Sequence, residues 1–195
     1  MKLENALAAR ICHDLITPLN AINLGLESLE ISNDSIILEG IKESTAKANI
    51  ILKYIRELFS EHDENFNYSV LNLNKIISEY LSCYKISFKL DSNIEGIAEI
   101  FGQLIMFACI IAKSNMPFGG NVECNFDMFV NEIKIDCSGK NISEIQISKN
   151  WRSDDEINSR SIFQYFWLKL QEENEIECKI TSGPESVTIL LKKFS

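Results

Sequence analysis

Apolar and polar positions in the N-terminal third of the chain follow the period of an α-helix. The apolar side chains between residues 3 and 31 recur every three or four positions, which predicts one amphipathic helix with a core stripe. The stripe consists of Leu3, Leu7, Ile11, Leu15, Leu19, Ile22, Leu26 and Leu29. Turn residues at 32–35 supply an N-cap for a second helix of the same spacing, which runs to about Glu61. Together these segments predict a long helical hairpin.

Two helices alone have too little mutual surface to bury both apolar stripes. We therefore expect two copies of the chain to pair through their hairpins into a four-helix bundle. In the alternative arrangement, the hairpin packs on the rest of its own chain. Both arrangements cover the stripes, and we favour the homodimer.

A polar segment at 61–65 is predicted to be a linker, and beyond it the pattern becomes mixed helix and strand. Helices are expected near residues 73–84, 99–115 and 159–174, and strands near 86–90, 121–129, 132–136, 175–181 and 186–192. This order is typical of an α+β sandwich. We therefore predict two domains, a helical hairpin over 1–62 and an α/β sandwich over 66–195.

The composition narrows the class of protein. An apolar content of 46% in 195 residues is enough for a packed core. The net charge of −9 comes from acidic residues spread along the chain, which argues against binding to nucleic acid or to an anionic membrane. We find neither an apolar run of about 20 residues nor a signal-peptide pattern, so a cytoplasmic location is expected.

Cysteine and histidine usage argues against a metal site and against disulfide bonds. The six cysteines lie far apart without a Cys-x-x-Cys pair, so we expect reduced thiols. His13 and His62 are the only imidazoles in the sequence, which disfavours a transition-metal centre. His62 lies in the linker, and we expect it to be an ordinary surface residue.

His13 is the candidate reactive group. It lies two residues from both Ile11 and Leu15, and two residues span about 200° of a helix, so a helix that buries the stripe exposes this imidazole. Asp14 follows directly and can orient the ring while the other nitrogen acts as a nucleophile. Pro18 should loosen or bend the helix one turn later. A lone exposed histidine is usually an unreactive surface residue, but the ordered set His-Asp-Leu-x-Thr-Pro-Leu is much more specific.

This set resembles the H-box of two-component histidine kinases. The wider segment 7–30, LAARICHDLITPLNAINLGLESLE, is similar to the ChpT type of bacterial histidine phosphotransferase, which has a kinase-like shape without kinase activity. The resemblance implies that His13 carries the phosphoryl group and that Asp14 supports it. It also implies a receiver-docking patch of Ala9, Ile16, Thr17 and Asn20, with Arg10 available for a charged contact. Ile16 stands where kinases commonly have Arg or Lys, and an apolar side chain there suits a docking surface.

The second domain resembles the ATP-binding domain of histidine kinases, with its site altered. Residues 103–120, QLIMFACIIAKSNMPFGG, match the N-box helix and the turn that follows it. The positions of two asparagines that hold magnesium and phosphate carry Phe107 and Ile111, which offer no oxygen ligand. The glycine boxes are also damaged, at 136–140 and at 159–164, although Asp136 keeps the aspartate that would meet adenine. We therefore expect this chain to bind neither ATP nor a metal ion.

Aromatic residues in the second domain are expected to be mostly structural. The run Phe163, Tyr165, Phe166 and Trp167 fits the buried face of a helix packed on a sheet. Trp151 and Arg152, in a polar loop, are slightly better candidates for a contact surface.

On this resemblance, we expect a homodimeric histidine phosphotransferase that moves a phosphoryl group between receiver-domain aspartates through a phosphohistidine at His13. The donor would be the receiver of a hybrid kinase, the acceptors would be response regulators, and the receivers would supply the magnesium. The ATPase-like domain would serve as a scaffold and take part in receiver docking. Three alternatives stay open: an active sensor histidine kinase, a non-catalytic dimeric adaptor, and a receiver phosphatase, the last suggested by Thr17.

Overall fold

The computed structural model describes residues 2–32, 34–60, 62–63, 66–127, 129–145, 147 and 156–193. It divides into two compact units, Met1–Ser60 with Ile157–Ile162, and Glu61–Glu156 with Phe163–Ser195. The short segment Ile157–Ile162 therefore groups with the helical hairpin, which the sequence pattern did not indicate. Within the described ranges, no helix is long and apolar enough to cross a membrane.

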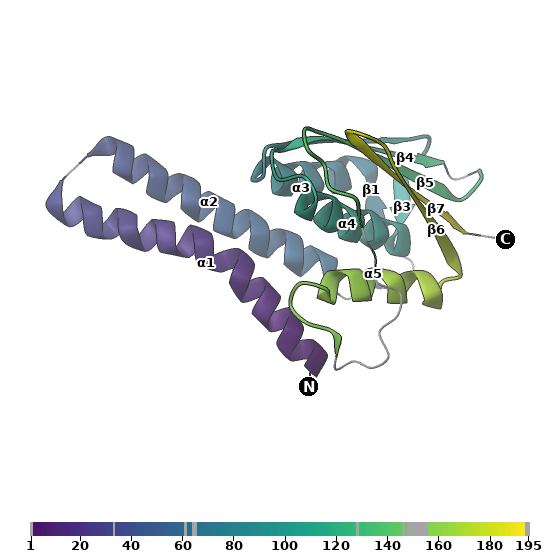
Figure 1. The fold of residues 1–195 in the computed structure, drawn as a ribbon, viewed down its shortest axis with the longest axis horizontal. Coiled ribbons are helices and arrows are strands. Elements are labelled where there is room, and N and C mark those ends of the chain that lie inside the picture. Colours follow the sequence, from purple (N-terminus) through teal and green to yellow (C-terminus); the bar gives the residue numbers. More distant parts are fainter. Residues whose placement is uncertain are drawn as a thin grey trace. The chain divides into compact units, whose positions relative to one another are not determined.

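The first unit contains the two predicted helices, α1 (Lys2–Ile31) and α2 (Ser35–Leu58), arranged as an antiparallel hairpin (Figure 1). Asp34 caps α2, because its Oδ1 accepts a hydrogen bond from the Ile36 amide at 2.9 Å. The predicted hairpin is confirmed, although α2 ends at Leu58 and not near Glu61.

Small residues bring α1 and α2 close together. A Cβ atom on Gly25 would lie 2.5 Å from Cγ1 of Ile41, so any larger residue there would push the helices apart. Pro18 on α1 and Ala48 on α2 are both buried. The face of α1 that meets α2 is therefore the one that carries Pro18 and Gly25.

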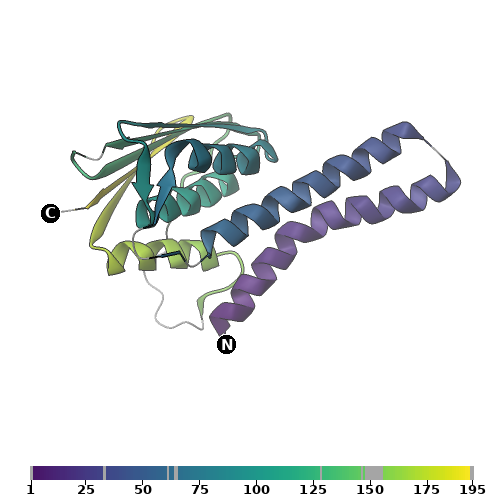
Figure 2. The ribbon, with the colours of Figure 1, turned by 180° about the vertical axis from the view of Figure 1, so that it is seen from behind.

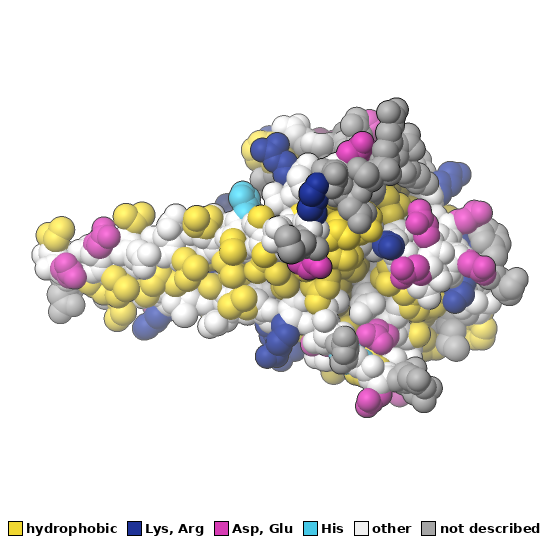
Figure 3. All heavy atoms as spheres, turned by 90° about the horizontal axis from the view of Figure 1, so that it is seen from below, with side chains coloured by type: hydrophobic (Ala, Val, Ile, Leu, Met, Phe, Trp, Pro, Cys, Tyr) yellow, Lys and Arg dark blue, Asp and Glu magenta, His cyan; other side chains and the backbone are white. Residues whose placement is uncertain are grey.

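The hairpin does not bury its whole apolar stripe. Leu19 and Leu26 on α1 remain about half exposed, at 49% and 51%, and Leu38 and Leu52 on α2 are similar. Figure 3 shows apolar side chains forming a band along the hairpin. This agrees with the expectation that two helices alone cannot bury both stripes, because they cover only one side of each other.

The second unit is a two-layer α+β sandwich, as predicted. Helices α3 (Val70–Ser82), α4 (Glu99–Ser114) and α5 (Ile162–Glu173) lie on one face of a five-stranded sheet (Figures 1 and 2). The strand order is β2-β4-β5-β7-β6, with β2 and β4 parallel and the other neighbours antiparallel. The strands are β2 (Ile86–Ser92), β4 (Gly120–Asp127), β5 (Glu132–Ser138), β6 (Ile176–Ser182) and β7 (Ser186–Lys193).

A separate two-stranded sheet was not predicted. It pairs β1 (Asn67–Ser69) with β3 (Gly96–Ala98) in antiparallel register, and Tyr68 lies opposite Ile97. Strands of three residues are too short to show an alternating pattern, so the sequence carries no periodic signal for them.

The core of the second unit lies between α4 and the sheet. Side chains alternate along β4 and β5, so that Cys124 and Cys137 point inward among apolar residues. Burial raises the pKa of the Cys137 thiol to about 12 and raises that of Cys124 as well. All six cysteines are free in the structure, and these buried thiols are packing groups with little thiolate character.

Candidate functional site

His13 lies on the solvent side of α1, as predicted. Its side chain is 77% exposed. Pro18 and Gly25, which face α2, lie about 120–140° around the helix from it. A partner protein can therefore reach the imidazole without any rearrangement of the hairpin.

Asp14 connects His13 to Arg10. The Asp14 side chain is only 8% exposed, and its Oδ1 lies 3.3 Å from Nδ1 of His13. Its other oxygen, Oδ2, accepts a hydrogen bond from Nε of Arg10 at 3.2 Å. When Nδ1 carries the proton and donates a hydrogen bond to this carboxylate, the lone pair of the ring lies on Nε2. In that tautomer, Nε2 is the nitrogen that can act as a nucleophile.

Arg10 does not have the role of a docking contact that we expected for it. Its guanidinium is only 14% exposed and forms an ion pair with Asp14, four residues along the same helix. We had expected Arg10 to be available to a partner, but it holds the carboxylate that faces His13. The spacing of four residues was visible in the sequence, and it is the signal that could have indicated this role.

The helix continues through Pro18. α1 runs without interruption from Lys2 to Ile31 with Pro18 inside it, and Figures 1 and 2 show the helix changing direction along its length. Proline has no amide hydrogen for the carbonyl of Asp14, which is the expected cause of such a bend. The bend follows the histidine by little more than one turn.

Ala9, Ile16, Thr17 and Asn20 are all exposed and surround His13 on the same face of α1. They lie four residues before it and three, four and seven residues after it, which are the spacings of one helical face. Ile16 is 55% exposed. We call these four residues the docking patch, and the structure leaves all of them accessible.

No known protein-family model matches the sequence. A search of curated proteins finds the protein phosphotransferase ChpT of Brucella abortus (strain 2308), 24% identical over 195 aligned residues that cover 96% of this chain and 93% of that protein. The chain is similar to ChpT over almost its whole length. The resemblance expected from residues 7–30 is therefore confirmed, and it extends through the second unit.

A solved structure of a bacterial phosphotransferase shares the fold. It superposes with a TM-score of 0.83 at 23% identity, over 97% of this chain and 95% of that one. The histidine kinase AdeS of Acinetobacter baumannii superposes more loosely, with a TM-score of 0.48 at 10% identity, over 93% of this chain and 96% of that one.

The N-box positions of the second unit are filled by the core. Phe107 and Ile111 on α4 are 4% and 3% exposed. The Phe107 ring lies 6.3 Å from the ring of Phe163 and 6.4 Å from that of Phe166. Aromatic packing therefore occupies the side of α4 where a kinase would hold phosphate and magnesium. Phe163 and Trp167 are buried, as expected of the aromatic run.

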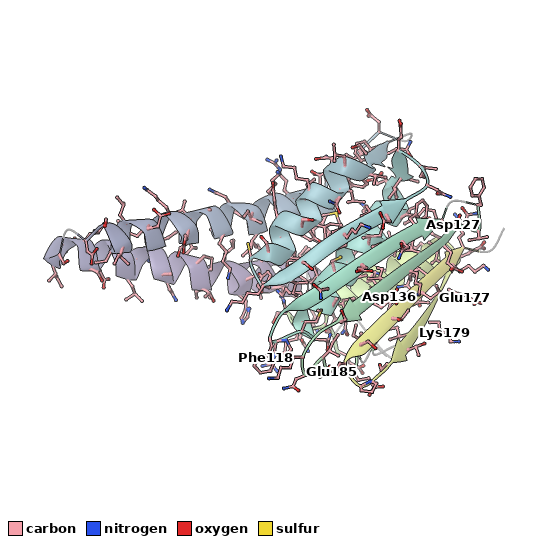
Figure 4. The ribbon with its side chains drawn as sticks, turned by 90° about the horizontal axis from the view of Figure 1, so that it is seen from above. Phe118, Asp127, Asp136, Glu177, Lys179 and Glu185 are labelled. Atoms are coloured by element: carbon pink, nitrogen blue, oxygen red, sulfur yellow. The ribbon has the colours of Figure 1, made fainter. Side chains whose placement is uncertain are left out.

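Asp136 does not point into the helix-facing side of the sheet. It lies within β5, between the inward-facing Ile135 and Cys137, and Figure 4 looks onto the face that carries it. Thr188 donates to its Oδ1 at 2.6 Å, and Lys134 Nζ lies 2.7 Å from Oδ2. Partial burial alone would raise the pKa of Asp136, but these hydrogen bonds outweigh it and lower the pKa. This carboxylate therefore takes part in a network that includes Thr188 on the neighbouring strand.

Gly119, Gly120 and the glycine-free segment 159–164 have structural roles. Gly119 and Gly120 have positive φ angles of 80° and 147°, and a Cβ on Gly119 would clash with the Lys85 carbonyl. The Gly120 amide donates to that carbonyl at 3.2 Å, so the turn joins the starts of β2 and β4. The glycine-free segment 159–164 leads into α5, and its Ile162 and Phe163 are buried.

The prediction for His62 is wrong. Its Nδ1 lies 2.9 Å from Oε1 of Glu99, and its ring stacks on Phe66 with the centroids 3.9 Å apart. The side chain is only 16% exposed, because it packs against Phe66 and against Glu99 at the start of α4. His62 is therefore part of the packing of the second unit. Trp151 and Arg152, which we expected to be candidates for a contact surface, lie outside the described residues.

Proposed function

We propose that this chain is a histidine phosphotransferase of a two-component phosphorelay, in which His13 carries the phosphoryl group. The observation that carries the proposal is the exposed imidazole with the Asp14 carboxylate at Nδ1. The similarity to the phosphotransferase ChpT over almost the whole chain supports the same reaction.

The chemistry at His13 is a transfer in two steps. Nε2 attacks the phosphorus of a receiver aspartyl phosphate, a bond from nitrogen to phosphorus forms, and the bond to the aspartate oxygen breaks with its electrons left on the carboxylate. The proton on Nδ1 stays opposite Asp14, whose negative charge stabilises the positively charged phosphoimidazole. The second step is the reverse reaction with the aspartate of another receiver. In-line positioning contributes most of the catalysis, and the receiver supplies the magnesium that offsets charge on the phosphoryl oxygens.

We assign the partners by the same resemblance. The donor is the receiver of a hybrid histidine kinase, and the acceptors are receivers of response regulators. The docking patch contacts the receiver around His13, and its exposed Ile16 gives that surface an apolar centre. We expect this relay to operate in the cytoplasm.

The relay chain is a homodimer in this proposal. Leu19 and Leu26 lie seven residues apart on one face of α1 and are about half exposed, which leaves apolar surface for a second hairpin to cover. This face lies about 120–140° around the helix from His13, so pairing into a four-helix bundle leaves the imidazole accessible.

We assign residues 66–195 a role as scaffold and in receiver recognition, without ATP binding. The buried Phe107 and Ile111 support this assignment, because neither can ligate magnesium. This distinguishes the proposal from an active sensor kinase, which requires nucleotide at this position.

Phosphate transfer from a labelled receiver tests the proposal. The chain is incubated with a receiver that carries radiolabelled aspartyl phosphate, without ATP, and label on the chain is measured after separation. Wild type should gain acid-labile, base-stable label, and His13→Gln should gain none. His62→Gln is the matched control, because His62 is the only other histidine, and it should be labelled like wild type.

Three results would identify an alternative function. Label transferred from ATP alone indicates a kinase, and the absence of label with intact receiver binding indicates an adaptor. Accelerated loss of receiver phosphate by His13→Ala indicates a phosphatase, and Thr17, exposed one turn from His13, is the residue to change next.

A further inference from the structure

The two edges of the five-stranded sheet differ in how their backbone is covered. β2 forms one edge and β6 the other. At β2, side chains of α3 take the outward-facing groups, since Asn74 Oδ1 accepts from the Leu90 amide at 2.9 Å and Ser78 donates to the Phe88 carbonyl at 3.4 Å. β6 pairs with β7 on one side, and none of the described strands lies on its other side. Figure 4 shows this strand, labelled at Glu177 and Lys179, at the border of the sheet.

The turn after β6 determines which backbone groups point outward. The Gly183 amide donates to the Ser186 carbonyl at 2.8 Å, so this pair is hydrogen-bonded. Bonded and non-bonded pairs alternate along an antiparallel ladder, so Thr181 with Thr188 is bonded and Ile180 with Ile189 is not. The N–H and C=O groups of Ile180 therefore face the open edge, where the described residues provide no partner for them.

A groove of about 590 Å³ lies beside this edge, between α5 and β6. Leu168, Ile176 and Cys178 provide apolar lining, and Glu172 and Glu175 provide the carboxylates, whereas the side chain of Glu177 alternates onto the outer face of the sheet. Both glutamates of the groove are exposed, and neither forms an ion pair with a described residue. The groove therefore combines an apolar floor with a negative rim.

We propose that the edge of β6 binds an extended basic segment of another protein, which pairs with β6 as a sixth strand of the sheet. Backbone hydrogen bonds to an edge strand provide affinity, and alternate side chains of the added strand enter adjacent pockets. Here the inward-facing side chains enter the groove. A lysine or arginine fits it, because its aliphatic stem packs on Leu168 and Ile176 while its charge meets the carboxylates.

Charge argues for a basic partner and against a second copy. Two chains paired through β6 would bring two sets of the same two carboxylates together, and the chain already has a net charge of −9. This site shares no residue with the His13 site, so its failure would leave the proposed phosphotransfer unaffected.

Designed peptides test the proposal on the full chain. The probe is a fluorescein-labelled heptapeptide of alternating threonine and arginine, and binding is measured by fluorescence anisotropy. A peptide with glutamate in place of arginine should not bind. Two further arginine peptides carry N-methyl groups on all arginine amides or on all threonine amides. Because only alternate amides of an added strand face β6, one of these two should lose binding and the other should keep it.

Protein variants and amide exchange locate the contact. Glu172→Gln with Glu175→Gln should weaken arginine-peptide binding about three- to tenfold, while the matched control Glu173→Gln, on the same helix as Glu172 but outside the groove, should leave it unchanged. Peptide binding should slow hydrogen exchange at the Ile180 amide by at least about tenfold. Exchange at Thr181, whose amide already bonds to β7, should not change.

Three outcomes overturn the proposal. Equal binding of the arginine and glutamate peptides rejects the charge argument, and unchanged exchange at Ile180 rejects strand addition. Slower exchange at Ile180 that appears without peptide and grows with protein concentration identifies a second copy as the occupant. Thermal unfolding of each variant shows whether it is folded before these results are compared.

Discussion

The helical hairpin and the α+β unit differ in how far they bury their apolar side chains. The hairpin leaves Leu19 and Leu26 half exposed and holds an 8% exposed carboxylate against an exposed histidine. The second unit buries 11 of the 16 residues of α4, including Phe107 and Ile111 at positions where kinases bind magnesium and phosphate. We therefore expect chemistry where a polar pair is held at the surface, and none where the core fills the positions that kinases use for magnesium and phosphate.

The largest expected effect comes from attempting to restore the kinase site. Phe107→Asn combined with Ile111→Asn should destabilise the chain by about 6 kcal/mol or more, because it removes two buried apolar side chains and buries two amides. Urea denaturation measures the loss, and calorimetry with magnesium-ATP should show no binding. A stable double variant that binds ATP would show that the core had not replaced the site.

Asp14→Asn should slow phosphate transfer to and from His13 by about 10²-fold, because the amide no longer stabilises the positively charged ring. Rapid-quench measurement of labelled chain gives the rate. Arg10→Met should have a smaller effect in the same direction, since it leaves the carboxylate in place but unanchored. Equal rates in all three proteins would refute the role assigned to the Asp14 carboxylate.

Leu26→Glu should weaken the proposed dimer by at least about tenfold, because a charge replaces apolar surface in both copies. Analytical ultracentrifugation over a concentration series measures the dissociation constant. Leu24→Glu is the matched control, since Leu24 is 63% exposed and lies about 20° around α1 from His13, away from the face of Leu26. A monomeric wild type, or equal effects of both variants, would contradict the proposed pairing face.

The smallest effect concerns acid stability. The pKa of Asp136 is lowered in the folded chain, so its contribution is present above the unfolded pKa of about 3.9 and is lost as pH falls through the folded value. Asp136→Asn should remove this contribution, which we expect to be below about 1 kcal/mol because the group is partly exposed. Unfolding free energies of both proteins, measured from neutral pH down to about pH 3, should converge at the acidic end. A constant difference would assign the effect to packing.

Two expectations failed for different physical reasons. His62 was expected at the surface, but it is positioned by Glu99, which lies 37 residues away and which the local pattern does not indicate. Arg10 was expected to be available to a partner, but it pairs with Asp14 on the same helix, at a spacing that the sequence does show. The three-residue strands β1 and β3 were missed because their pairing depends on residues about thirty positions apart.

What the sequence by itself determined is local: the two long helices, most strands, and the outward position of His13. Helical period and capping act within a few residues, so they can be inferred without knowledge of the fold. Only the tertiary structure decided that Phe107 packs against Phe163, that Asp136 lies on the outer face, and that β6 is an edge among the described strands, beside an acidic groove. Those features depend on contacts between distant segments, which exist only once the chain has folded.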